Sequence, residues 1–171
     1  MKTSIKFKQS VVAAVLGIFC VGAAVAGDAP KNMNADAISL KKAIAIAKQH
    51  TGAVPVEAER DSHMGSIVYE IELVGEQGKE FHTVIDADTG EIIKSREHLE
   101  DDHEDLQEQA SFLAGVKNGQ YQTLETALAA AEAKHAGQVY EIELDDDYGI
   151  SYEVKLLAAD GSKVKTRISA E

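Results

Sequence analysis

Residues 67–91, IVYEIELVGEQGKEFHTVIDADTGE, decide the fold of this chain. Over residues 67–73, apolar side chains alternate with Glu70 and Glu72, which is the period of a strand with one buried and one exposed face. After a turn that contains two glycines, the alternation resumes over residues 81–85. The stretch therefore predicts two antiparallel strands joined by a short connection.

An amphipathic helix is expected before these strands, over about residues 40–50, because apolar side chains recur there at i, i+4 and i+7. Ser39 is well placed as its N-cap, and Gly52 as the residue that ends it. A short strand over residues 56–60 and a turn over residues 61–65 then lead into the central stretch.

The whole pattern occurs twice. The cap and the apolar stripe of the helix recur at a constant offset of 84 residues: Ser39, Leu40, Ala43, Ile44 and Ala47 correspond to Thr123, Leu124, Ala127, Leu128 and Ala131. The strands recur at an offset of 83, so that Tyr69 corresponds to Tyr152. We therefore predict an α+β fold of two tandem units, each an amphipathic helix packed on a three-stranded antiparallel sheet. The second copy ends before any counterpart of the turn at residues 89–91, which leaves its last strand as a possible pairing edge.

The start of the chain has the layout of a secretory signal peptide. Three lysines precede an apolar run, and Ala24-Val25-Ala26 supplies a cleavage signal before Gly27. The run is shorter than the roughly 20 residues that span a bilayer, so cleavage is favoured over a membrane anchor. Cys20 lies inside the run, so the mature chain contains no cysteine. We expect a periplasmic protein, with secretion into the medium as the alternative.

The predicted organisation has five parts. It comprises a signal peptide (1–26), a flexible tail (27–37), a first unit (38–96), an acidic and helical linker (97–120) and a second unit (121–171).

The mature chain is strongly acidic. Without the signal peptide it carries 14 basic and 29 acidic residues, a formal charge of −15. Such a charge repels nucleic acid and anionic lipid headgroups, and it suits a cationic partner surface or a cation. We expect no nucleic acid partner and no stable membrane anchor after cleavage.

Several of these motifs together resemble the PepSY domain. The resemblance rests on the helix opening SLKKA at residues 39–43, on YEIEL at residues 69–73 and on DADTGE at residues 86–91. The second copy resembles the domain through LETA and YEVKL, but it lacks the final Asp-x-x-Thr-Gly turn. PepSY domains occur in propeptides of secreted metallopeptidases and in small exported bacterial proteins. The resemblance implies a non-catalytic module that restrains a protease or binds another envelope protein.

A candidate surface for such a partner is the sheet face opposite the helices, which Glu70, Glu72 and Glu153 would line. The structural alternative is that these glutamates are simply solvated. Tyr69 and Tyr152 are expected to pack under the helices, with the hydroxyl group at solvent or at a backbone group.

The linker offers a second hypothesis, a divalent metal site. Its sequence EHLEDDHED is rich in histidine and carboxylates, and in a continuous helix His98, Asp102 and Asp105 would share one face. His103 adds a donor, although its spacing of five from His98 places the two on different faces. The alternative is a solvated acidic helix. Otherwise no cofactor is expected, although a pair formed by His63 and Met64 in the predicted turn could also touch a soft metal.

The sequence does not predict an enzyme. It contains no Gly-x-Ser-x-Gly elbow, no phosphate-binding glycine-rich loop and no His-Glu-x-x-His motif, and the mature chain has no cysteine nucleophile.

Overall fold

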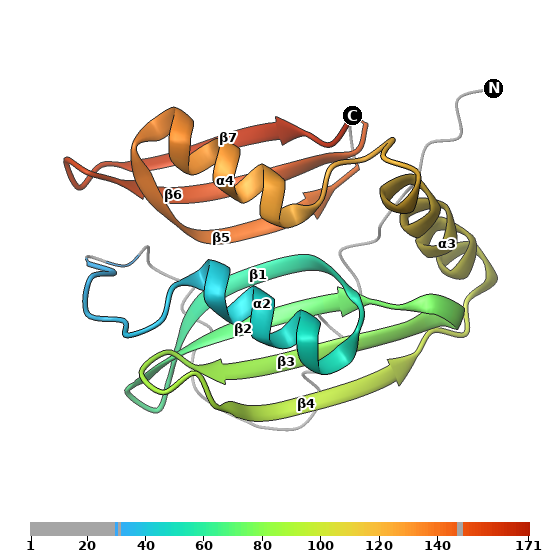
Figure 1. Cartoon of the computed structure of the whole chain (residues 1–171), viewed down its shortest axis with the longest axis horizontal. Coiled ribbons are helices and arrows are strands. Elements are labelled where there is room, and N and C mark those ends of the chain that lie inside the picture. Colours follow the sequence, from blue (N-terminus) through green and yellow to red (C-terminus); the bar gives the residue numbers. More distant parts are fainter. Residues whose placement is uncertain (1–29, 31, 147–148) are drawn as a thin grey trace.

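The computed structural model describes residue 30 and residues 32–146 and 149–171 (Figure 1). The predicted signal peptide lies outside the described residues. The elements along the chain are α2 (Leu40–Thr51), β1 (Val54–His63), β2 (Ser66–Val74), the short 3-10 helix η1 (Glu76–Gly78), β3 (Lys79–Asp86), β4 (Ile92–Leu99), α3 (His103–Lys117), α4 (Leu124–His135), β5 (Gly137–Asp145), β6 (Ser151–Ala158) and β7 (Lys163–Ser169).

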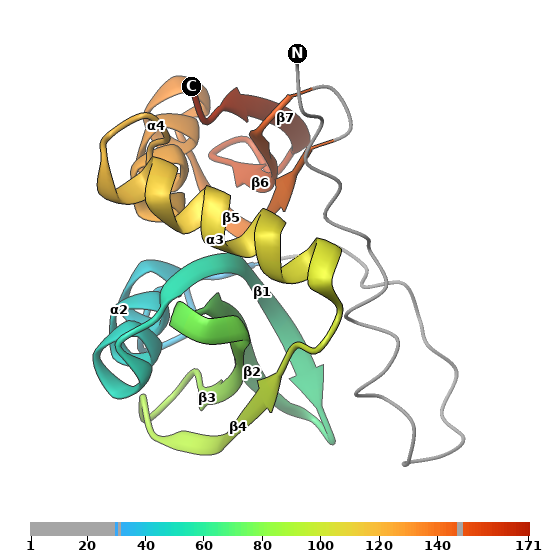
Figure 2. The same cartoon turned by 90° about the vertical axis from the view of Figure 1, so that its right-hand side faces the viewer.

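The described strands form one antiparallel sheet in the order β4-β3-β2-β1-β5-β6-β7. Helix α2 lies over β1, β2 and β3, and α4 lies over β5, β6 and β7, both on the same face of the sheet (Figures 1 and 2). The predicted α+β fold of two helix-and-sheet units is therefore confirmed. The units join edge to edge, because β1 pairs with β5 in one continuous sheet.

The prediction of three strands in each unit is correct for the second unit and wrong for the first. The turn at residues 86–90 leads into β4, which pairs with β3 along its whole length. This strand is exposed at nearly every residue, so its sequence IIKSREHL lacks the apolar alternation that marks a buried face.

Both helices begin where the repeat predicts, and α2 ends at the predicted residue. The Ser39 and Thr123 side chains cap α2 and α4 by accepting a hydrogen bond from the backbone N–H three residues later. Gly52 ends α2 in the left-handed conformation, with φ of 72°. The buried faces of the helices are the predicted stripes: Leu40, Ala43, Ile44 and Ala47 in α2, and Leu124, Ala127, Leu128 and Ala131 in α4.

The two tyrosines occupy equivalent positions under the helices. Both are fully buried. The Tyr69 hydroxyl lies 2.9 Å from the carbonyl oxygen of Ile38, and the Tyr152 hydroxyl lies 3.0 Å from that of Gln122. These acceptors are themselves related by the offset of 84. Each tyrosine therefore ties its central strand to the segment that enters its helix.

The end of the predicted flexible tail is part of the first unit. Asp36 accepts two hydrogen bonds from Arg60, at 2.6 and 2.8 Å, and its carboxylate also lies 2.9 Å from the Tyr69 hydroxyl. Burial alone would raise the pKa of Asp36, but the bonds from Arg60 and Tyr69 outweigh it and hold that pKa below its usual value. The tail predicted to reach residue 37 is thus anchored from Asp36 onward.

The linker is a strand end followed by a helix. Strand β4 continues to Leu99, and α3 begins only at His103, with Asp102 as its N-cap. Phe112 of α3 is fully buried and stacks on Tyr121, with ring centroids 6.2 Å apart. Figure 2 shows α3 running across the boundary between the two units. No helix in the described part of the chain is long and apolar enough to cross a membrane.

Candidate functional site

The sheet face opposite α2 and α4 carries a concentration of glutamates. Alternation along the strands turns the apolar side chains toward the helices and leaves the acidic ones on this open face. Because the units join in register, the acidic side chains meet across the junction: Glu57 lies opposite both Glu72 and Glu143, and Glu59 lies opposite Glu70. We call this set the acidic face, and it consists of Glu57, Glu59, Glu70, Glu72, Glu141, Glu143 and Glu153.

Basic side chains of the outer strands border the acidic face. In the second unit, Lys155 pairs with Glu141, and Lys165 and Arg167 approach Glu153. In the first unit, the His82 Nε2 atom lies 2.9 Å from the Glu70 Oε2 atom, and this hydrogen bond lowers the pKa of Glu70.

The middle of the acidic face holds four half-buried carboxyl groups without ion-pair partners in the described part of the chain. Among the described residues, no ion pair reaches Glu57, Glu59, Glu72 or Glu143. Burial and then the neighbouring carboxylates raise the pKa of Glu57 to about 8 and that of Glu59 to about 7. Burial is also the main cause that raises the pKa values of Glu72 and Glu143. Cations brought to this surface would relieve the repulsion.

The three glutamates predicted to line this face are placed on two different strands. Glu70 and Glu72 lie on β2, and Glu153 lies on β6, on the other side of the junction. Sequence reasoning missed the four glutamates of β1 and β5 between them. Their alternation was visible in VEAE and YEIE, but only the pairing of β1 with β5 shows that they meet.

The helix face proposed for a linker metal site does not form. His98 lies in β4, paired with Glu80, whereas Asp102 caps α3 and Asp105 and His103 lie in its first turn. The chain leaves the strand between His98 and Asp102, so the spacing of a continuous helix does not apply. Among the described residues, the one group of three or more metal-ligating side chains with closely spaced donor atoms lies elsewhere, at Asp61, His63 and Glu70.

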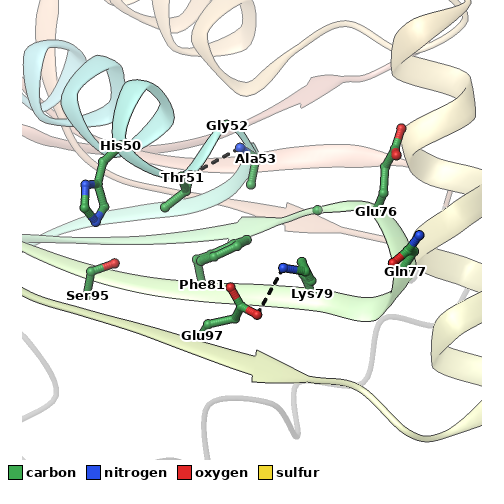
Figure 3. A pocket seen from close by; sticks show the side chains of 11 residues that line it. His50, Thr51, Gly52, Ala53, Glu76, Gln77, Lys79, Phe81, Ser95 and Glu97 are labelled. Atoms are coloured by element: carbon green, nitrogen blue, oxygen red, sulfur yellow. Dashed lines mark hydrogen bonds and ion pairs between the residues drawn. The ribbon is translucent and has the colours of Figure 1, made fainter.

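A hollow of about 610 Å³ opens on the helix side of the first unit, between the end of α2 and strands β3 and β4 (Figure 3). The Phe81 ring lies within it, and an ion pair of 3.2 Å joins Lys79 to Glu97 at one side. None of the residues predicted as partner or metal sites lines this hollow. It is therefore separate from the acidic face.

Comparison with known proteins agrees with the repeat. The chain is 28% identical over 137 residues to the uncharacterised protein YkoJ of Bacillus subtilis (strain 168), and the match covers 80% of this chain and 71% of YkoJ. A crystal structure of a "putative lipoprotein" from Clostridium difficile 630 is 22% identical with a TM-score of 0.46, over 83% of this chain and 93% of that one. Residues 37–96 and 121–171 each match the family described as "Peptidase propeptide and YPEB domain". With two matched segments that together span more than half of its length, the chain belongs to the PepSY family.

Proposed function

We propose that this protein is an exported, non-catalytic binding module that regulates or inhibits an envelope or secreted protein, of which a protease is the first candidate. Its acidic face docks a cationic surface of that partner. The observation that carries the proposal is the cluster of four half-buried glutamates at the middle of the sheet, which no ion pair reaches among the described residues. Holding like charges together destabilises a fold, and a cationic partner would offset that cost.

Two further observations support this function. The family match is to a domain of peptidase propeptides, and a propeptide acts by contact with its protease. The start of the sequence has the layout of a secretory signal, which would deliver the protein to the compartment of such partners. We place the protein in the periplasm, with secretion as the alternative.

Site-specific photocrosslinking in the native cell envelope tests the proposal. A photoreactive amino acid replaces Glu141 of the acidic face, and in a matched variant it replaces Ala129, an exposed residue of α4 on the covered side. We expect a discrete crosslinked product from position 141 and none from position 129. Recovery of the protein alone from both positions, at native abundance, would contradict the proposal.

Charge substitution then tests the chemistry of the contact. The double variant Glu57→Gln and Glu143→Gln should lower capture of the crosslinked partner at least tenfold. Glu76→Gln combined with Glu91→Gln also removes two carboxyl groups, at exposed positions outside the acidic face, and should leave capture unchanged. If the captured partner is a protease, adding the purified protein should lower its rate of peptide hydrolysis.

A further inference from the structure

The hairpin end of the open face brings three metal-ligating side chains together. Asp61 and His63 lie two residues apart on β1, so their side chains project from the same face of the strand. Glu70 lies diagonally across from Asp61 on β2, because Asp61 pairs with Val68. One donor atom from each of the three residues lies within 4.8 Å of the other two.

The turn predicted over residues 61–65 was too long, so Asp61 and His63 were not expected on one strand. In the structure β1 continues to His63, and only Met64 and Gly65 form the turn. Asp61 and His63 are therefore held by strand pairing rather than by a loop.

We propose that Asp61, His63 and Glu70 bind a divalent transition-metal ion, with zinc as the representative ion. One imidazole and two carboxylates are a donor set that suits zinc, nickel or copper, whereas calcium prefers oxygen donors alone. Donor atoms around a tetrahedral zinc ion are about 3.4 Å apart, since each bond is about 2.1 Å long. Rotation of the exposed His63 side chain can close the remaining gap.

His82 positions one of the three ligands. Its Nε2 atom lies 2.9 Å from the Oε2 atom of Glu70, so the imidazole can hold one carboxylate oxygen and leave the other for the metal. Glu59, opposite Glu70 in the register, adds a further carboxyl group beside the site. Both features favour a bound cation.

The equivalent positions of the second unit form ion pairs in place of the proposed metal site. By the offset of 83, Glu70 corresponds to Glu153 and His82 to Lys165, and Lys165 forms an ion pair with Glu153. Asp145 holds the place of Asp61 in the register of the second unit, and it lies 2.8 Å from an Arg167 nitrogen. Lysine and arginine thus form ion pairs with these carboxylates in the second unit, whereas in the first unit the His82 imidazole holds Glu70 and Val84 stands in place of Arg167.

Calorimetric titration of the purified protein at pH 7 with zinc and, separately, with calcium tests the site. We expect one zinc ion per chain with a Kd on the order of micromolar, and calcium binding at least tenfold weaker. His63→Ala should weaken zinc binding at least tenfold. His82→Lys should do the same, because the new cation would compete for Glu70 as Lys165 does for Glu153.

A double variant of the linker, His98→Ala with His103→Ala, is the matched control and should bind zinc as the unchanged protein does. The NMR signals of the His63 imidazole should shift on addition of zinc, which is a readout independent of the calorimetry. Zinc binding no tighter than about millimolar in the unchanged protein would overturn the site. Undiminished binding after His63→Ala, or loss of binding in the linker variant, would also overturn it.

Discussion

Glu57 of β1 and Glu143 of β5 lie directly opposite each other at the junction where the two units become one sheet. On the covered side of the same junction, Ala58 lies opposite Ile142, and both are fully buried. An ion pair of 2.7 Å between Lys48 and Glu125 also links α2 to α4 across the two units. Apolar packing and backbone pairing therefore hold the junction together against repulsion on the open face.

Lowering the pH should stabilise this protein between about pH 8 and pH 5. The pKa of Glu57 is about 8 in the folded chain and near 4.5 when the side chain is solvated, so between these values the folded state binds the additional proton. The stabilisation is complete below the lower value and is lost as the pH rises through about 8. Glu57→Gln removes the charge and should raise the free energy of unfolding by about 1–2 kcal/mol at pH 8.5, with little effect at pH 5.

Urea denaturation at pH 5, 7 and 8.5 measures this effect. Glu91→Gln, at an exposed position outside the acidic face, is the control and should change the free energy of unfolding by less than about 0.5 kcal/mol at each pH. Equal stability of the unchanged protein and Glu57→Gln at pH 8.5 would contradict the prediction.

The parts of the fold that repeat could be predicted because the same periodicity of apolar side chains occurs in both copies. The helix caps, the apolar stripes and the strands that carry Tyr69 and Tyr152 all follow from side-chain periodicity, and the structure has them where expected. Strand β4 could not be predicted in this way. It pairs through its backbone and buries almost no side chain, so its residues leave no apolar pattern.

The arrangement of the acidic face and of the proposed metal site depends on pairing between strands, which the periodicity of a single strand does not predict. The acidic face required the pairing of β1 with β5, and nothing in either strand alone selects that partner. The ligand cluster around His63 required that β1 continue through Asp61 and Ser62, polar residues that are typical of turns. Backbone pairing with β2 outweighed that local preference.

Removing the two equivalent tyrosine hydroxyl groups should have unequal effects. Tyr69 lies within hydrogen-bond distance of both the Asp36 carboxylate and the Ile38 carbonyl group, whereas Tyr152 has only the Gln122 carbonyl group among the described residues. Because bonds to charged groups contribute more, Tyr69→Phe should cost about 2 kcal/mol and Tyr152→Phe about 1 kcal/mol. Equilibrium unfolding in urea compares them, and a larger cost for Tyr152→Phe would show that the Asp36 contact adds no stability.

A methyl group at Gly78 should disrupt the docking of α3. The residue has φ of 75°, and a Cβ atom there would lie 2.3 Å from the Leu106 Cδ2 atom and 3.0 Å from the Glu100 carbonyl oxygen. Gly161 has a similar φ of 82° with no neighbouring atom within 4 Å, so Gly161→Ala measures the backbone strain alone. We expect a cost of about 1 kcal/mol for Gly161→Ala and about 2–4 kcal/mol for Gly78→Ala. Thermal unfolding followed by circular dichroism measures the destabilisation by each variant. Equal destabilisation by the two variants would show that α3 shifts to accommodate the methyl group at no further cost.

Stability and partner binding should respond in opposite directions to a positive charge at the junction. Glu143→Lys replaces a repulsive cross-strand pair with an attractive one opposite Glu57, which should stabilise the fold by about 0.5–1 kcal/mol at pH 8.5. The same change removes negative charge from the middle of the acidic face, so capture of a cationic partner should fall at least tenfold. Glu91→Lys changes the net charge equally at an exposed position outside that face and should alter neither quantity. Urea denaturation and crosslinking yield measure the two effects on the same preparations. A variant that is more stable yet captures its partner as well as the unchanged protein would show that the glutamates are not the docking surface.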